Sequence, residues 1–298
     1  MSDAAEGGAG PTGLDDEAAR AGSGDAPPRA SVLMPTYNDG RFIRQAIHSI
    51  LAQTFGDFEL VIVNDGSTDD TARTLLEYAR RDKRIRVLTN ERNLGVFASL
   101  NRGLEVCRGE YVVRMDADDI TIEERLEKQL AVMDAQPDIV ALGGALTYID
   151  AGGQDLNVTR RCAVGGSLLR QSPLLHPTVV FRRKVVQEHA IRYRGRFRGA
   201  EDYFFWLELS RFGRLSAIDD VVLNYRISAG AARMRHLKRM LWDTVQAKAC
   251  GLLKLGIRPR FVDVVCFLAE CLLLLVPSCL IRWYYIRKTF GRKTKVEL

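Results

Sequence analysis

The stretch Tyr111-Val112-Val113-Arg114-Met115-Asp116-Ala117-Asp118-Asp119 decides how this chain is organised. Its apolar, β-branched half predicts a buried strand, which stops abruptly at three carboxylates. In an open α/β sheet, ligands bind just beyond the carboxyl ends of the strands. Asp116 and Asp118 therefore predict a pair of oxygen ligands for magnesium or manganese. The structural alternative is a solvated turn in which Asp119 caps a helix that begins near Ile122.

The chain around this stretch alternates strands with helices. Apolar runs predict four strands, at residues 30–34, 58–63, 85–88 and 111–115. Three segments between them are predicted to be helical, at residues 41–53, 67–81 and 95–107, with Ser67 or Thr68 as the cap of the second. Because strands joined by helices form right-handed crossovers, this rhythm predicts a parallel sheet.

Three polar turns should meet at one edge of that sheet. They begin at Thr36, Asp65 and Asp116, after the first, second and fourth strands. Asp65 can accept a hydrogen bond from the N–H of a base, and Tyr37 can lie against a ring. The combination favours a nucleotide site, although every parallel sheet has polar loops at this edge.

The second half of the domain is less regular. We expect helices at 123–136 and 182–189, strands at 139–145, 179–181, 215–218 and 221–226, and no clear pattern over 146–175. Glu201 and Asp202 open a strongly aromatic helix. Acids in a first helical turn are favoured by the helix dipole, which is the structural alternative for either residue. Both acids before a buried aromatic face favour a carboxylate held rigidly at a cleft.

Length and composition bound the class of protein. A chain of 298 residues with 47% hydrophobic residues can form one large domain with appendages. Residues 1–29 carry six acids against two bases and little to bury, which predicts a disordered tail without a secretory signal. The six cysteines form no C-x-x-C pair, so we interpret them as reduced residues of a cytosolic protein.

Six segments in order resemble glycosyltransferase family 2, the inverting nucleotide-sugar transferases of the GT-A fold. They are Ser31-Val-Leu-Met-Pro-Thr-Tyr-Asn, Leu60-Val-Ile-Val-Asn-Asp-Gly-Ser-Thr-Asp-Asp, Asn93-Leu-Gly, Asp116-Ala-Asp-Asp, His176-Pro and Ala200-Glu-Asp-Tyr. The resemblance implies a nucleotide-sugar pocket that includes Pro35, Thr36, Tyr37, Asn38, Asp65 and Ala117. It also implies that Asp116 and Asp118 serve the ribose, the diphosphate and a manganese or magnesium ion. Asp202 would be the catalytic base, with Glu201 beside it.

The resemblance covers roughly residues 30–226, so we expect a GT-A domain over 30–230. It implies transfer from a UDP- or dTDP-sugar to a glycan or lipid-linked acceptor in surface polysaccharide synthesis. The chain departs from the family pattern at Ser228, near which many relatives have a histidine that helps to bind the metal or diphosphate. It also lacks the Gln-x-x-Arg-Trp signature of processive synthases, which favours addition of a single sugar.

Two other functions compete with this interpretation. One is a non-catalytic nucleotide-sugar binder, which the presence of both Asp116/Asp118 and Asp202 disfavours. The other is a phosphohydrolase of the haloacid dehalogenase type, which also ends a strand in Asp-x-Asp. That motif closes the first strand and continues with Thr or Val, whereas here it closes the fourth strand and Ile120 stands at that position.

The C-terminal region, 231–298, is predicted to be basic and helical. Residues 264–281 form an apolar run with one charge, Glu270, and residues 282–298 carry six bases against one acid. Bases on both flanks of an apolar run favour a membrane surface over nucleic acid. We therefore expect a shallow or re-entrant helix over 264–281 at the cytoplasmic face of the inner membrane. A core helix or the interface of a homo-oligomer is the alternative.

Overall fold

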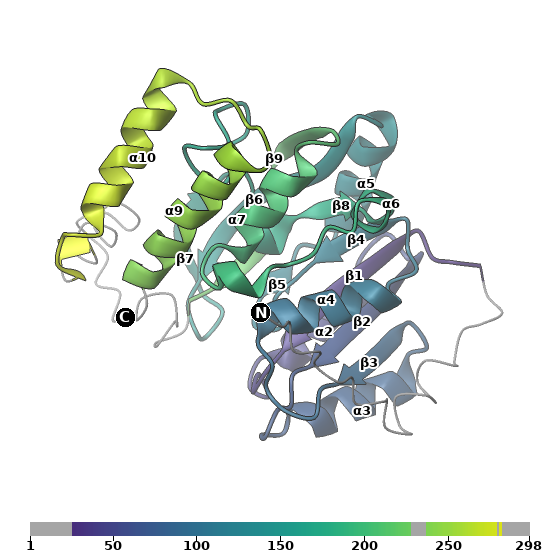
Figure 1. The fold of residues 1–298 in the computed structure, drawn as a ribbon. Coiled ribbons are helices and arrows are strands. Elements are labelled where there is room, and N and C mark those ends of the chain that lie inside the picture. Colours follow the sequence, from purple (N-terminus) through teal and green to yellow (C-terminus); the bar gives the residue numbers. More distant parts are fainter. Residues whose placement is uncertain (1–25, 228–236, 279, 282–298) are drawn as a thin grey trace, which may run out of the picture.

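The computed structural model describes residues 26–227, 237–278 and 280–281. Its first half is a parallel sheet whose central strand is β1 (Ala30–Thr36). β1 pairs with β2 (Phe58–Asn64) on one side and with β4 (Tyr111–Arg114) on the other. β3 (Ile85–Thr89) pairs with the far side of β2. All three pairings are parallel, as predicted, and Figure 1 shows their carboxyl ends at a common edge.

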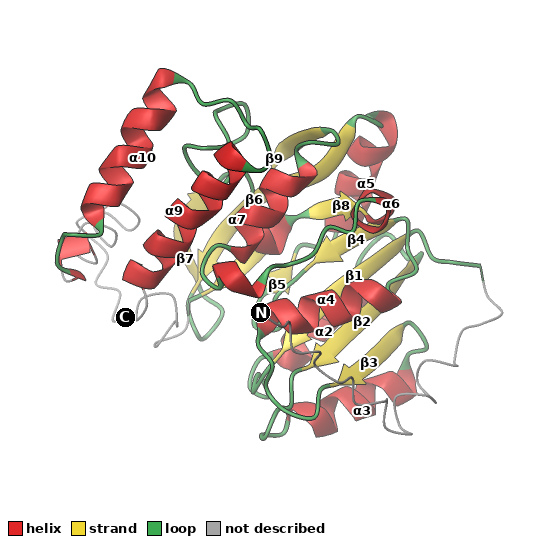
Figure 2. Cartoon of the chain, in the orientation of Figure 1, coloured by secondary structure: helices red, strands yellow, loops and turns green. Residues whose placement is uncertain are grey.

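The sheet continues beyond β4 with strands of both directions. β8 (Val180–Arg182) is antiparallel to β4 and to β6 (Ile139–Ile149), while β9 (Arg214–Arg226) is parallel to β6. Two further strands, both antiparallel to their neighbours, are β5 (Ile120–Thr121) beside β9 and β7 (Asp155–Arg160) beside β6. The predicted α/β class is confirmed, and the second half of the sheet is mixed (Figure 2).

Helices cover both faces of the sheet. One face packs against α2 (Ile43–Leu51), α3 (Thr71–Arg81) and α5 (Arg125–Ala135). The other packs against α4 (Val96–Val106), α6 (Arg183–Glu188) and α7 (Glu201–Leu209). Two short 3-10 turns complete the domain, η1 (His176–Thr178) and η2 (Gly195–Phe197). Because both faces are covered, β1 buries Val32 and Met34 on one side and Leu33 on the other, and its residues 32–35 are all apolar.

The C-terminal helices extend this arrangement outward. α9 (Leu237–Leu253) packs against α7, and α10 (Phe261–Leu273) packs against α9, so the three run side by side in Figure 1. Lys248 of α9 is 1% exposed, and its Nζ lies 2.6 Å from both carboxylate oxygens of Glu270 in α10. The single acid of the apolar run therefore binds α10 to the rest of the protein.

Several local predictions are wrong. Asp119 caps no helix, because residues 120–121 form β5 and α5 begins only at Arg125. α3 begins at Thr71 and has no side-chain cap, so neither Ser67 nor Thr68 fills that role. The two strands expected over 215–226 are one, and the strand expected at 139–145 continues to Ile149. The apolar helix expected over 264–281 is not continuous, since α10 ends at Leu273.

In the part of the chain that the structure describes, no helix is both long and apolar enough to cross a membrane.

The predicted N-terminal tail falls almost entirely on residues 1–25, which lie outside the described residues. Arg29, at its end, already belongs to the folded domain. Its guanidinium pairs with the carboxylates of Glu110 and Asp134, and its carbonyl oxygen accepts a hydrogen bond from the Tyr111 N–H.

A buried carboxylate joins the first two strands to the end of α4. Glu59 of β2 is 2% exposed and accepts hydrogen bonds from Ser31 Oγ at 2.6 Å and from the Arg108 N–H at 2.7 Å. Arg86 Nη1 and Arg108 Nε each lie 3.0 Å from it. Burial disfavours the charge, but these donors outweigh burial and hold the pKa of Glu59 below its ordinary value of 4.5.

Replacing Glu59 with Gln should destabilise the fold by about 3–5 kcal/mol at neutral pH, because both arginines lose their buried partner. A depressed carboxylate pKa stabilises the fold above the unfolded-state value and loses this effect as pH falls through the folded-state value. The difference between wild type and Glu59→Gln should therefore shrink below pH 4.5. Urea unfolding across this range measures it, with Glu91→Gln, at an exposed glutamate, as the control. A difference that does not change with pH would contradict the assignment.

Candidate active site

Asn38 holds the loops after β1 and β2 together. Its backbone N–H donates to Ser67 Oγ at 3.0 Å, and its Oδ1 accepts from the Thr68 N–H at 2.8 Å. Asn38 has a φ of 57°, a left-handed conformation that asparagine adopts more readily than most residues. The polar groups of Ser67 and Thr68 thus face the neighbouring loop, which is why they do not cap α3.

Asp65 is buried at the end of β2, and the protein itself uses its carboxylate. Oδ1 accepts from Asn90 Nδ2 at 2.6 Å and from the Leu94 N–H at 2.9 Å, while Oδ2 accepts from the Gly95 N–H at 2.8 Å. These bonds hold the loop that precedes α4 against the sheet. A carboxylate has about four acceptor positions, so Asp65 retains room for about one further donor.

The remaining predicted nucleotide residues lie at the same edge. Pro35 and Thr36 are buried in β1, and the Thr36 carbonyl oxygen accepts from the Asp65 N–H at 2.9 Å. Tyr37 follows with a side chain that is 42% exposed, so its ring is available to a flat ligand. The structure therefore brings Pro35, Thr36, Tyr37, Asn38 and Asp65 together, and their contact with a nucleotide stays a prediction.

Four carboxylates gather beyond β1 and β4: Asp39, Asp116, Asp118 and Asp119. Burial, with the charges of Asp116 and Asp39, raises the pKa of Asp118 to about 7. Burial and its two acidic neighbours raise the pKa of Asp119 well above the usual range. Ala117 is buried between the two predicted metal ligands. This dense negative charge on oxygen donors fits a divalent cation.

The described residues contain no group of three or more His, Cys, Asp or Glu side chains arranged to hold a metal ion. Asp116 and Asp118 would thus be two protein ligands, with water and phosphate oxygens as the others, as magnesium commonly has. The departure from the family pattern at Ser228 lies outside the described residues.

Arg114 is buried beneath the carboxylates and neutralises one of them. Its Nη1 lies 2.5 Å from Asp116 Oδ2. Burial opposes the charge of the guanidinium, but the nearby Asp116 outweighs burial and raises the pKa of Arg114, which therefore stays protonated. The negative charge of Asp116 is balanced by the same contact.

Arg226, the last residue of β9, fixes the shape of the loop after β4. Its backbone N–H donates to Asp119 Oδ1 at 2.8 Å, and its Nε donates to the Asp118 carbonyl oxygen at 2.7 Å. The rest of the buried guanidinium donates to Gln45 Oε1 and to the carbonyl oxygens of Asp150 and Ala151. One side chain therefore joins the acidic loop to α2 and to the turn after β6.

Asp116 and Asp202 line the same cavity, of about 600 Å³. This volume lies within the range of about 300–1,000 Å³ that is typical of small-molecule sites. Three arginines from separate parts of the chain line it too: Arg114, Arg198 and Arg239. With Glu201, the cleft has three carboxylates and three guanidinium groups, and such a lining can bind both a cation and a diphosphate.

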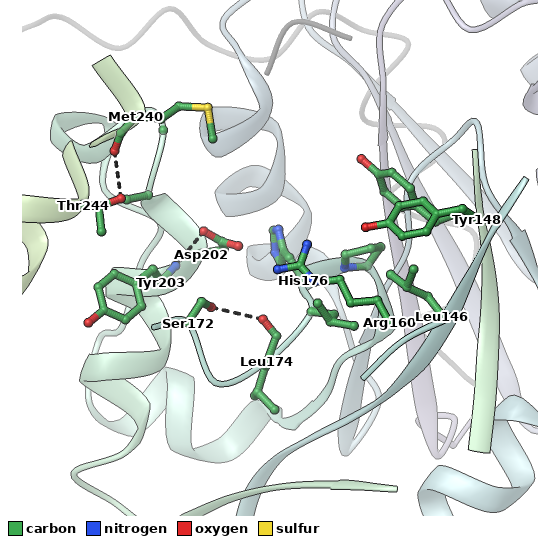
Figure 3. A pocket seen from close by; sticks show the side chains of 15 residues that line it. Leu146, Tyr148, Arg160, Ser172, Leu174, His176, Asp202, Tyr203, Met240 and Thr244 are labelled. Atoms are coloured by element: carbon green, nitrogen blue, oxygen red, sulfur yellow. Dashed lines mark hydrogen bonds between the residues drawn. The ribbon is translucent and has the colours of Figure 1, made fainter. Parts of the chain in front are cut away.

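Asp202 is positioned by the first turn of α7. The Tyr203 N–H donates to Asp202 Oδ1 at 2.7 Å, and the Tyr203 hydroxyl donates to the Leu168 carbonyl oxygen at 2.6 Å. The aromatic residues that follow are buried and anchor the helix. Glu201 lines the same cavity. Figure 3 shows Asp202 beside His176, whose Nε2 lies 3.1 Å from the buried Tyr193 hydroxyl.

The sequence prediction missed the cations of this site. Arg114 could have been noticed, since it is a charged residue inside an apolar run. Arg226 was part of a recognised segment, but nothing local to it indicates a bond to Asp118, 108 residues earlier. Arg239 lies in the region predicted to be basic and helical, and Arg198 precedes the aromatic helix, but only the fold brings the two to the cleft.

Comparisons with known proteins agree with this geometry. Residues 31–198 match the model of the family described as glycosyl transferase family 2, which is more than half of the chain. The chain belongs to glycosyl transferase family 2. It is therefore a nucleotide-sugar glycosyltransferase, and neither the phosphohydrolase nor the non-catalytic binder is favoured.

Two curated relatives are similar over most of the domain. The first, an uncharacterized glycosyltransferase of Haemophilus influenzae, is 34% identical over 220 residues, which are 67% of this chain and 66% of that protein. The second, the O-antigen biosynthesis glycosyltransferase WbnJ of Escherichia coli, is 32% identical over 204 residues, which are 66% of this chain and 79% of WbnJ.

Solved structures confirm the predicted GT-A fold. S. aureus TarS 1-349 in complex with UDP-GlcNAc has a TM-score of 0.57 at 19% identity, and the match covers 88% of each chain. The mannosyltransferase PcManGT from Pyrobaculum calidifontis, in complex with GDP-Man and Mn²⁺, has a TM-score of 0.58 at 17% identity. That match covers 93% of this chain and 91% of PcManGT.

Replacing Arg226 with Lys should destabilise this family 2 domain by about 2–4 kcal/mol, because lysine cannot make the forked set of buried hydrogen bonds. Affinity for the nucleotide-sugar donor should fall with it, since the loop after β4 loses its fixed shape. Urea unfolding and titration with a panel of nucleoside diphosphates measure the two effects. Arg73→Lys, in an exposed ion pair with Asp70, is the matched control. Unfolding and nucleotide binding equal to wild type in Arg226→Lys would show that the loop needs no such support.

Proposed function

We propose that this enzyme transfers one sugar from a nucleoside diphosphate sugar to an acceptor hydroxyl with inversion, and that Asp202 is the base. The supporting observation is that Asp202 and Asp116 line one cavity of about 600 Å³. We favour a UDP- or dTDP-sugar as the donor, since TarS, which shares the fold, was solved in complex with UDP-GlcNAc. A glycan or lipid-linked acceptor of surface polysaccharide synthesis fits the role that the name of WbnJ gives, O-antigen biosynthesis.

Inversion takes a single displacement, so one base and a means of stabilising the leaving group suffice. Asp202 takes the proton of the acceptor hydroxyl as its oxygen attacks the anomeric carbon. Arg114, Arg198 and Arg239 line the cavity and offset the charge of the departing nucleoside diphosphate. Tyr37 and Asp65 hold the base of the nucleotide at the neighbouring edge of the sheet.

A divalent cation, manganese or magnesium, would be held by Asp116 and Asp118. The Mn²⁺ in the PcManGT complex supports this choice. When bound, the cation supplies positive charge for the diphosphate oxygens. The protein's own part is to keep both carboxylates in place, which Arg114 does for Asp116 and the Arg226 bond to the Asp118 carbonyl does for the loop.

Asp202→Asn should leave the affinity for the nucleotide nearly unchanged and lower the turnover rate on the order of a hundredfold to ten-thousandfold. The amide keeps the shape of the carboxylate but cannot accept the proton. Screening the protein with a panel of nucleotide sugars for diphosphate release identifies the donor and measures this rate. If affinity collapses while turnover at saturation survives, Asp202 belongs to the donor site instead.

Asp118→Ala tests the predicted metal ligand, as Asp202→Asn tests the predicted base. It should abolish metal-dependent donor binding, whereas Asp202→Asn should not, because the two carboxylates have different roles. Titration of UDP with and without manganese separates them. Undiminished activity of Asp118→Ala, or of wild type in excess chelator, would remove the metal from the proposal.

We also propose that α10 lies on the cytoplasmic face of the inner membrane. Glu270 fixes one side of the helix to α9, and large apolar side chains on its other side are exposed: Phe261 83%, Leu268 56% and Leu272 64%. Exposed bases precede the helix at Lys254, Arg258 and Arg260, and six more follow in residues 282–298. An anionic bilayer complements both the apolar face and these bases, each worth about 1 kcal/mol near its surface.

Introducing Leu268→Asp together with Leu272→Asp should move the protein from the membrane fraction to the soluble one. Each leucine removed from lipid costs about 1.5–3 kcal/mol of attachment, and the new acids repel anionic lipid. Leu76→Asp on α3, which is 55% exposed, is the matched control. Fractionation with salt and detergent washes measures attachment. A wild-type protein that is soluble and dimeric without detergent would make this face the interface of a homo-oligomer.

A further inference from the structure

Asp202 also lines a second cavity, of about 260 Å³, that lies toward β6 and β7. Its other lining residues include Tyr148, Arg160, Ser172, Tyr225 and Thr244. Asp116 lines the first cavity and is not among the residues around the second. Asp202 therefore stands where the two cavities meet, with the predicted metal ligand on one side only.

Arg160 is the cation of the second cavity. It extends from β7, where it pairs across the sheet with Leu146, and Figure 3 shows its side chain directed into the pocket between Asp202 and Tyr148. Within the described residues its guanidinium makes no hydrogen bond and no ion pair. Arg114, Arg198 and Arg239 line the first cavity, so the diphosphate there does not require Arg160.

Aromatic surface lies on the same wall as Arg160. The rings of Tyr148 and Tyr225 pack edge to face, with centroids 5.7 Å apart at 89°, and Leu146 lies beside Arg160 on the neighbouring strand. The hydroxyl groups of the two tyrosines, with those of Ser172 and Thr244, add polar atoms to the lining. Apolar ring faces and a few hydroxyls suit a sugar ring, which has C–H patches between its own hydroxyls.

We propose that this second cavity is the acceptor subsite and that Arg160 makes it select an anionic sugar or polyol, one that carries a carboxylate or a phosphate. The inference rests on the proposed function. A forked guanidinium binds either anion through two parallel N–H···O bonds. The acceptor's anion on Arg160 would direct a neighbouring hydroxyl at Asp202.

The reaction then balances across the two cavities. Asp202 takes the hydroxyl proton, and the acceptor oxygen forms the new bond to the anomeric carbon. The bond from that carbon to the diphosphate oxygen breaks, and its electron pair leaves with the nucleoside diphosphate. No other reactant is needed.

The test compares each anionic probe with a neutral counterpart: methyl β-D-glucuronide against methyl β-D-glucoside, and glycerol 3-phosphate against glycerol. Binding to the full chain is measured by NMR in the presence of UDP. Because Arg160 is exposed to solvent, in wild type one anionic probe should bind about twofold to fivefold more tightly than its neutral counterpart. Which pair shows the preference distinguishes a carboxylate from a phosphate. Arg160→Gln should abolish the preference.

Arg161→Gln is the control. Arg161 is the next residue, is exposed, and lies 3.7 Å from Asp219 outside the cavity, so the preference should survive its loss. Equal binding of both members in both pairs by wild type, including no detectable binding, overturns the inference. So does a preference that persists in Arg160→Gln or disappears in Arg161→Gln. UDP binding and donor turnover without charge preference refute only the subsite, whereas their absence refutes the proposed function.

Discussion

The arrangement of this active site depends on how the carboxylates beyond β4 are kept close together. Asp39, Asp116, Asp118 and Asp119 repel one another, and burial raises the pKa of several of them. Two arginines hold the cluster: Arg114 pairs with Asp116, and Arg226 binds the loop through Asp119 and the Asp118 carbonyl. Removing either arginine would leave a carboxylate without its partner, which is strongly destabilising in a site shielded from water. The two arginines therefore hold the acidic loop in one shape, which is what the proposed cation site would need.

The first half of the fold was predictable because of where its side chains go. Strands of a parallel sheet covered on both faces are largely apolar, and the runs at 30–34 and 58–63 show this apart from the buried pair Ser31 and Glu59. β7 has no such signal, since most of its side chains are exposed. β9 was predicted as two strands because Asp219 and Asp220 interrupt its apolar pattern, although its backbone continues unbroken beside β6.

Site residues were predictable where they form short motifs, and their partners were not. Asp116, Asp118 and Asp202 stand in compact, recognisable segments. The contacts that fix them come from distant parts of the chain, such as Arg226 to Gln45 across 181 residues. The same limit applies to α10. Its composition indicated a membrane helix with an unexplained acid. Only the fold shows that Glu270 pairs with Lys248, so that this side of the helix packs against α9.

The position of Asp202 where two cavities meet is consistent with the single displacement proposed above. In such a reaction the attacking oxygen enters on one side of the anomeric carbon and the diphosphate departs from the opposite side, so the base is needed only on the side of the acceptor. The cations divide in the same way, with Arg114, Arg198 and Arg239 in the larger cavity and Arg160 in the smaller. Because α7 opens with Asp202 and then buries its aromatic residues in the domain, this junction is fixed by the core. In the proposed mechanism the packing of α7 would thus fix the position of the base, while residues of β6 and β7 would determine which acceptor binds.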